Sequence, residues 1–143
     1  MIRIEHALTI ERPPGDVFAY LTDPDKLAEW QATAHGARLD SESMGEGAQL
    51  VETRTFLGRR METRMEVAEY QPGSRFTLQA RSGPIPFRVT HRIEAADGGT
   101  WLQVVLEGEP GGFFRLAEPL VERQARQQVE TDFQRLKEIL ESR

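Results

Sequence analysis

The stretch PGDVFAYLTDPDKLAEWQ, residues 14–31, decides the fold that we predict for this chain. Pro14 suits the first turn of a helix because the N–H that proline lacks would have no helical partner there. Behind it, Val17, Phe18 and Leu21 fall on one helical face. The stretch therefore opens with a short amphipathic helix.

A second short helix follows after a sharp break. Asp23 lies where an N-cap belongs, and Pro24 occupies the first position after it, so the first helix cannot continue through this pair. Leu27 and Trp30 share one face of the second helix. We expect the helix pair to close one mouth of a curved sheet and to point the indole of Trp30 towards a ligand.

Strands surround this helix pair in the sequence. From Ile2 to Ile10 every second residue is apolar or histidine, the period of a strand with one buried face. From about residue 38 to 109 further strands are separated by turns rich in Gly, Pro and Asp. The turns are Gly45-Glu46-Gly47, Leu57-Gly58-Arg59, Gln71-Pro72-Gly73, Ser82-Gly83-Pro84 and Asp97-Gly98-Gly99. Such short turns predict an antiparallel meander, with about seven strands in the sheet.

The last third of the chain has a helical pattern whose apolar residues lie on two different sides. Those of residues 113–121 cluster on one side of a helical wheel, and those of residues 125–140 on a side rotated by about a third of a turn. Pro119 lies between the two clusters. We expect a kink or break near Pro119, with a lid-like first segment and a long terminal helix.

Composition limits the class of protein. At 143 residues the chain fits one domain, residues 1–143. Its net charge is −5 and its longest basic run is Arg59-Arg60, which argues against a nucleic-acid partner. Without cysteine it has no disulfide or thiolate, and the spacing of its three histidines predicts no metal site. No signal peptide or membrane span is recognisable, so we expect a cytoplasmic protein without membrane insertion or cofactor.

Four segments carry a resemblance to a known family. RPPGDVFAYLTDPDKLAEW, residues 12–30, closely resembles the N-terminal pattern of the bacterial polyketide cyclase/dehydrase family of the START-like (SRPBCC) superfamily. MEVAEYQPGSRFTL (65–78), GGTWLQVVLEGEP (98–110) and DFQRLKEILES (132–142) look like that family's strand-turn-strand, penultimate strand and terminal helix. The resemblance is specific for the fold but does not determine the function, because this superfamily hosts lipid carriers, receptors, cyclases, dehydratases, cochaperone domains and ribosome-associated factors on one scaffold.

The resemblance implies an α+β helix-grip fold, in which a curved antiparallel sheet of about seven strands wraps around a long C-terminal helix. Two short helices are expected between strands 1 and 2. A cavity is also implied, since a strongly curved sheet and one helix cannot approach closely everywhere. By strand parity the side chains expected to face it are His6, Leu8, Met61, Thr63, Met65, Phe76, Leu78, Phe87, Val89, His91, Leu102 and Val104. Trp30 and the segment from Phe113 to Leu116 are expected to close its ends.

Several of these side chains have two interpretations. His6 and His91 occupy positions where the strand pattern otherwise places an apolar residue. In a cavity either could act as a general acid or base, or orient a ligand by a hydrogen bond. The alternative is a buried imidazole bonded to a neighbouring backbone group or hydroxyl. Likewise, Trp30, Met61 and Met65 are either cavity wall or plain core.

Three hypotheses for function follow. The leading one is binding of an apolar or aromatic small molecule, lipid or polyketide-like, with His6, His91 and Thr63 fixing its orientation. The second is a cofactor-independent cyclase or dehydratase in which a cavity histidine moves a proton. The third is a protein-interaction module of the cochaperone or ribosome-associated type, which would use the outer sheet or Phe113-Phe114. Each is compatible with a monomer or a homodimer.

Overall fold

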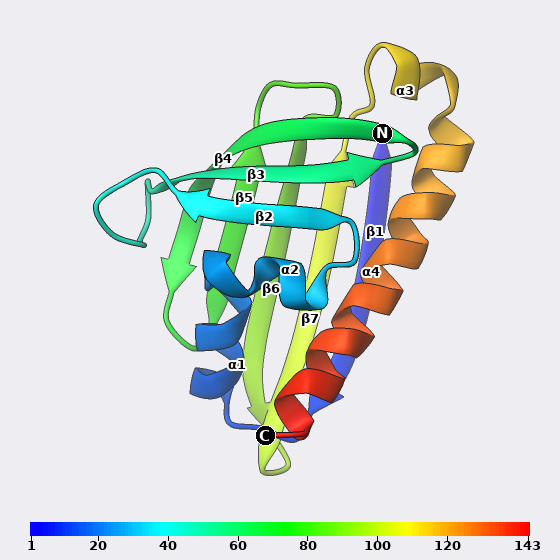
Figure 1. Cartoon of the computed structure of the whole chain (residues 1–143). Coiled ribbons are helices and arrows are strands. Elements are labelled where there is room, and N and C mark those ends of the chain that lie inside the picture. Colours follow the sequence, from blue (N-terminus) through cyan, green and yellow to red (C-terminus); the bar gives the residue numbers. More distant parts are fainter.

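The computed structural model describes residues 1–143 except for the side chain of Phe113. It confirms the α+β helix-grip fold, with seven antiparallel strands and a long C-terminal helix (Figure 1). The strands are β1 (Ile2–Ile10), β2 (Ala34–Leu39), β3 (Gln49–Phe56), β4 (Arg59–Gln71), β5 (Arg75–Ala80), β6 (Phe87–Ala96) and β7 (Gly99–Gly108). The helices are α1 (Pro14–Leu21), the 3₁₀ turn η1 (Pro24–Lys26), α2 (Leu27–Trp30), α3 (Phe113–Leu116) and α4 (Glu118–Glu141).

The predicted meander runs from β2 to β7. The strand order is β1-β7-β6-β5-β4-β3-β2, so each strand after β1 pairs with its successor and β1 pairs with the last strand. Two of the hairpins turn on a pair of residues with positive φ, Leu57-Gly58 (49° and 77°) and Asp97-Gly98 (47° and 80°). Turns of this kind match the right-handed twist of the flanking strands.

The break between the two N-terminal helices has the predicted cause. The carboxylate of Asp23 accepts a hydrogen bond from the backbone N–H of Asp25 at 3.0 Å, which caps the second helix. As expected, the second helix is short and ends at Trp30; it consists of the 3₁₀ turn η1 followed directly by the single turn α2. It lies against α4, where Nε of Arg135 donates to the backbone oxygen of Glu29 at 2.6 Å. The side chain of Trp30 is 1% exposed.

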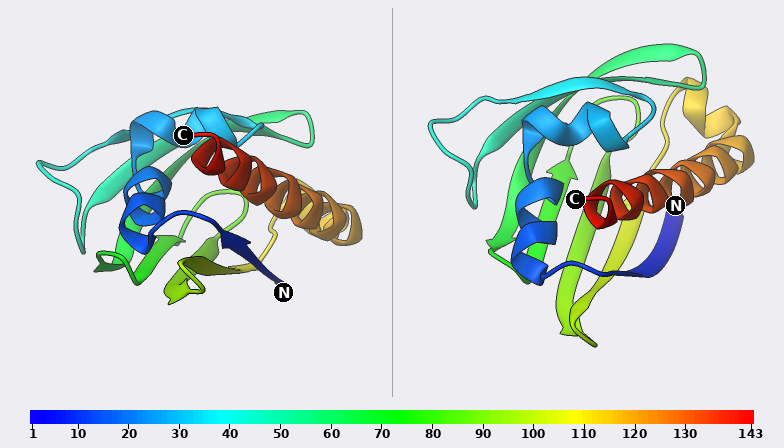
Figure 2. Two further views of the ribbon diagram at one scale, coloured as in Figure 1. Left: turned by 90° about the horizontal axis from the view of Figure 1, so that it is seen from below. Right: turned by 60° about the horizontal axis from the view of Figure 1, so that its bottom comes forward.

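The sheet bends around α4 (Figure 2), and the C-terminal end of the helix is bonded to the end of β1 and to the loop that follows it. Helix α4 packs directly on β1. Nη1 of Arg12 donates to the carbonyl of Leu140 at 2.8 Å, and Nζ of Lys137 donates to that of Thr9 at 2.5 Å. Cations suit the end of a helix because the carbonyls there are unpaired and carry partial negative charge. The helix is therefore held close to the β1 edge of the sheet.

The expected break near Pro119 is confirmed. Helix α3 ends at Leu116, and α4 begins at Glu118 with Pro119 in its first turn. Phe114 is 2% exposed, and its ring centroid lies 5.8 Å from that of Phe56 at the end of β3. This contact fixes the segment against the sheet.

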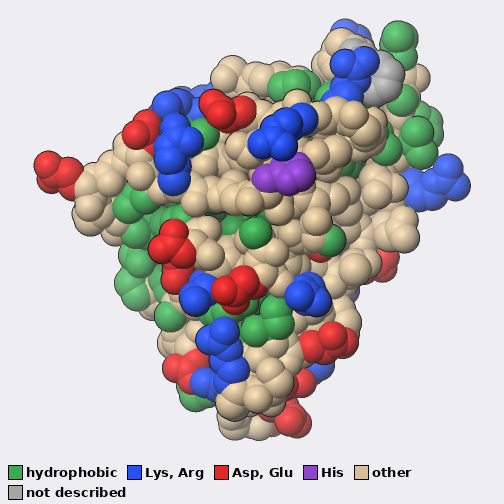
Figure 3. Space-filling view, viewed as in Figure 1, with side chains coloured by type: hydrophobic (Ala, Val, Ile, Leu, Met, Phe, Trp, Pro, Cys, Tyr) green, Lys and Arg blue, Asp and Glu red, His purple; other side chains and the backbone are tan. Residues whose placement is uncertain are grey.

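Charged side chains of both signs are interspersed over the face seen in Figure 3. This mixture agrees with the moderate net charge of −5.

Gly99 sets how closely β1 and β7 approach each other. A Cβ added there would lie 2.5 Å from the carbonyl oxygen of Ile10 and 3.3 Å from Cα of Glu11, both backbone atoms. Gly99→Ala is therefore expected to lower the free energy of unfolding by about 1–3 kcal/mol, because the strands must separate. Urea denaturation measures the free energy of unfolding. The matched change Gly45→Ala, where the added methyl meets open space, should have little effect, and equal losses in the two variants would refute the argument.

Candidate ligand-binding cavity

A cavity of about 220 Å³ lies between the sheet and residues 121–133 of α4. It is bordered by two apolar clusters. The larger contributes Trp30, Leu50 and Met65 to the lining, and the smaller contributes Phe56 and Val121. Because α4 is held against β1, it cannot also rest on β3, β4 and β5, which curve away from it (Figure 2). The cavity occupies the resulting space.

Most of the side chains predicted from strand parity do line this cavity. They are Met61, Thr63 and Met65 of β4, Phe76 and Leu78 of β5, Phe87, Val89 and His91 of β6, and Val104 of β7. Trp30 of α2 also lines it, as expected. Its indole Nε1 is buried and has no hydrogen-bond acceptor among the described residues.

Four predicted residues do not line the cavity. His6 and Leu8 belong to β1, on which α4 packs, and both are half-buried side chains outside the cavity lining. Leu102 is completely buried in the larger apolar cluster. Leu116 is 91% exposed because α3 ends there and the chain turns before α4. The prediction for Phe113 concerns a side chain outside the described part of the structure.

His91 is a buried, neutral imidazole. Nδ1 lies 2.9 Å from the backbone oxygen of Phe76. A carbonyl can only accept, so Nδ1 carries the proton and Nε2 is left as an acceptor. Burial lowers the pKa of His91 to about 4, although the bond to Phe76 partly opposes this. The backbone-bonded alternative stated above is the one that the structure has, and the residue also borders the cavity.

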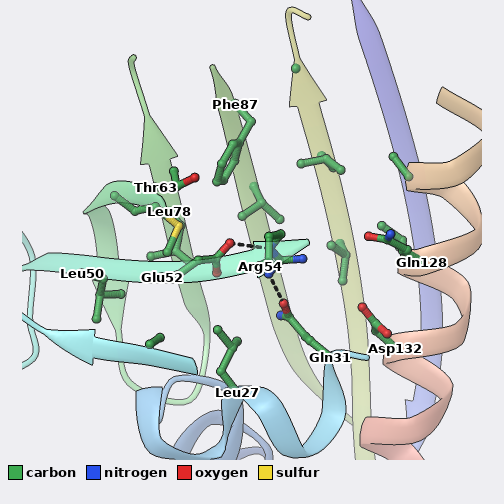
Figure 4. A pocket seen from close by; sticks show the side chains of 18 of the residues that line it. Leu27, Gln31, Leu50, Glu52, Arg54, Thr63, Leu78, Phe87, Gln128 and Asp132 are labelled. Carbon is green, nitrogen blue, oxygen red and sulfur yellow. Dashed lines mark hydrogen bonds and ion pairs between the residues drawn. The ribbon is translucent and has the colours of Figure 1, made fainter. Parts of the chain in front are cut away.

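The sequence prediction missed a polar group at the α2 end of the cavity, formed by Gln31, Glu52, Arg54, Gln128 and Asp132 (Figure 4). Nε of Arg54 donates to Oε1 of Glu52 at 2.6 Å. Nη2 of Arg54 donates to Oε1 of Gln31, and Nη1 donates to the hydroxyl of Thr33 at 3.3 Å. Glu52 is 6% exposed, so this ion pair is largely buried.

Asp132 faces the ion pair from α4. It is 6% exposed, and its Oδ1 accepts from the backbone N–H of Ala32 at 3.2 Å. Burial raises the pKa of Asp132, while the Ala32 bond and the charge of Arg54 lower it in part. Gln128, one turn earlier on the same helix, also lines the cavity (Figure 4). Among the described residues, no His, Asp and Glu side chains are grouped as a metal site.

The sheet, the terminal helix and the cavity between them define a helix-grip fold, which a START superfamily protein of known structure shares. Among proteins with this fold, the chain belongs to the polyketide cyclase / dehydrase and lipid transport family, whose model matches residues 1–141. No curated protein matches the sequence. None of the described helices is both long and apolar enough to cross a bilayer.

Solved structures share the fold at low sequence identity. A protein of Thermus thermophilus superposes with a TM-score of 0.84 at 17% identity, covering 98% of this chain and 97% of that one. A START superfamily protein from Mycobacterium smegmatis gives 0.81 at 16% identity, with the same coverages of 98% and 97%. The di-domain ARO/CYC protein BexL of the BE-7585A biosynthetic pathway gives 0.75 at 12%, covering 96% of this chain and 46% of that one.

Proposed function

We propose that the protein binds an apolar or aromatic small molecule, lipid or polyketide-like, in the cavity. The observation that carries this proposal is the cavity itself, whose walls are mainly apolar side chains such as Leu50, Met65, Phe87 and Val104. Burial of apolar ligand surface would supply most of the affinity, at about 25 cal/mol per Å². The family description, which names polyketide cyclases and lipid transport, supports the same class of ligand.

The size of the cavity limits the ligand. An engineered cavity of about 150 Å³ lined by Leu, Ile and Phe is large enough to bind benzene. At about 220 Å³ the present cavity would take a ligand portion of one or two rings. Met61 and Met65 are flexible parts of its wall and would let it adapt to shape.

A cyclase or dehydratase is the second candidate, and the family name favours it. His91 is poorly suited to the proton transfer, because a pKa of about 4 leaves it uncharged and a weak base at neutral pH. Asp132, whose pKa is raised, would be the better proton donor beside a ligand. Turnover of a polyketide-like substrate that Asp132→Asn abolishes would favour this candidate. An interaction module is less well supported, since it needs no cavity.

Filling the cavity tests the proposal. Ala125 of α4 lines the cavity, and Ala125→Phe is expected to place a ring in it and to weaken binding of naphthalene at least about tenfold. Isothermal titration calorimetry measures the affinity, and thermal unfolding checks that the variant is folded. Gln127→Phe adds the same ring at an exposed position of the same helix and should leave binding unchanged. Equal affinity in the Ala125 variant, or no binding by the unmodified protein, would refute the proposal.

A further inference from the structure

We propose that the ligand carries a neutral hydroxyl group, an alcohol or a phenol, which binds at the polar end of the cavity between Asp132 and Gln128. This inference rests on the proposed function, because it describes one part of the same cavity. It follows from the charge of the polar group and from the hydrogen bonds that its members leave unmade.

The charge of Arg54 is already compensated. Its guanidinium pairs with Glu52 at 2.6 Å and also donates to Gln31 and Thr33. The positive and negative charges of this pair cancel, and Asp132 adds a further negative charge whenever it is ionised. The polar end therefore has a charge of zero or below. A ligand carboxylate would lose its hydration here without meeting a net positive charge, which is unfavourable.

Two side chains of α4, Asp132 and Gln128, have hydrogen-bonding atoms that suit a hydroxyl. Oδ1 of Asp132 is used by the N–H of Ala32, whereas Oδ2 has no hydrogen-bond partner among the described residues. The amide of Gln128 likewise has none within the described part of the chain, and both side chains border the cavity (Figure 4). A hydroxyl can donate to a carboxylate oxygen and accept from an amide N–H at the same time. A ketone could only accept, which would leave Oδ2 of an ionised Asp132 without a donor.

Burial makes these hydrogen bonds selective. A ligand without a hydroxyl would cover Asp132, which is 6% exposed, and would leave its Oδ2 without a hydrogen bond. An unmade hydrogen bond to a buried charged group costs more than a made bond contributes. The raised pKa of Asp132 does not remove the preference, because a protonated carboxyl can donate to the oxygen of the same hydroxyl.

Three aromatic probes of similar size test the inference at pH 7: naphthalene, 2-naphthol and 2-naphthoate. Calorimetry on the unmodified protein is expected to give 2-naphthol an affinity about tenfold above that of naphthalene, with 2-naphthoate the weakest. Asp132→Asn keeps the acceptor for Ala32 and removes the charge. It is expected to reduce the preference for 2-naphthol to about threefold or less and to strengthen 2-naphthoate relative to naphthalene. Loss of packing alone would weaken all three probes and would not strengthen 2-naphthoate relative to naphthalene.

Glu130→Gln is the matched control, because it removes one negative charge from the exposed face of the same helix. It should leave the order of the three probes unchanged. If naphthalene and 2-naphthol bind equally, or if 2-naphthoate binds best, the hydroxyl inference is wrong while the proposal of an apolar ligand stands. If the unmodified protein binds none of the three, the proposed function fails and this inference fails with it.

Discussion

Glu52→Leu is expected to lower the free energy of unfolding by about 3 kcal/mol. The substitution leaves the guanidinium of Arg54 without its ion-pair partner at a site where the arginine side chain is 18% exposed. Removing one member of a buried ion pair is far more damaging than removing both, because the remaining charge stays in a poorly hydrated place. Gln31 and Thr33 would still accept hydrogen bonds from Arg54, but neither carries a negative charge.

The double variant Glu52→Leu with Arg54→Met separates this cause from loss of packing. Because it removes both charges and keeps similar volumes, it should recover most of the stability in urea denaturation. Asp40→Asn breaks the pair of Asp40 with Arg64, in which both side chains are exposed, and should have a much smaller effect. A double variant less stable than Glu52→Leu alone would show that the ion pair is not the source of the loss.

Acidification from pH 7.5 to pH 5 is expected to cost about 2 kcal/mol of stability through His91 alone. Its pKa is about 4 in the folded protein and about 6.5 in an unfolded chain. Between these values the unfolded chain binds a proton that the folded protein does not. Stability is therefore complete above pH 6.5 and is lost as the pH falls towards 4.

His91→Asn isolates this contribution, because the asparagine cannot be protonated in that range. Urea denaturation at several pH values should show a shallower decline below pH 6.5 for the variant than for the unmodified protein. Asp132 acts in the opposite sense, since its raised pKa favours the folded state as the pH falls, and it is present in both proteins. Equal slopes, or an NMR titration that places the pKa of His91 near 6.5, would refute the prediction.

The sequence predicts the fold well because its strongest signals are local. The cap at Asp23 depends on its own loop, and the Leu57-Gly58 and Asp97-Gly98 turns depend on two residues each. Strand alternation also predicts correctly which side chains of β4, β5 and β6 face inwards.

Alternation identifies the inner face of a strand but not what covers it. His6 and Leu8 follow the pattern of β1, yet they do not line the cavity, because α4 packs on β1 and the cavity lies towards the other strands. Only the packing of elements distant in the sequence determines this. The helical wheel of residues 113–121 groups Leu116 with apolar neighbours because it assumes one continuous helix. In the structure α3 ends at Leu116.

The polar end of the cavity left a weaker signal. On β3, Glu52 and Arg54 share their parity with Leu50 and Phe56, so the apolar members could have indicated that the charged ones also point inwards. Asp132 follows no comparable pattern. Its place beside Ala32 depends on contact between α2 and α4, which the sequence does not predict.

The pairing of β1 with β7 has a consequence for the order of folding. Ile4 lies opposite Leu106, so the first strand gains its neighbour only when the last strand is available. Contacts between residues so far apart along the chain slow folding, because a long loop must close before they form. During synthesis β1 would leave the ribosome early and would remain unpaired until β7 has also been synthesised.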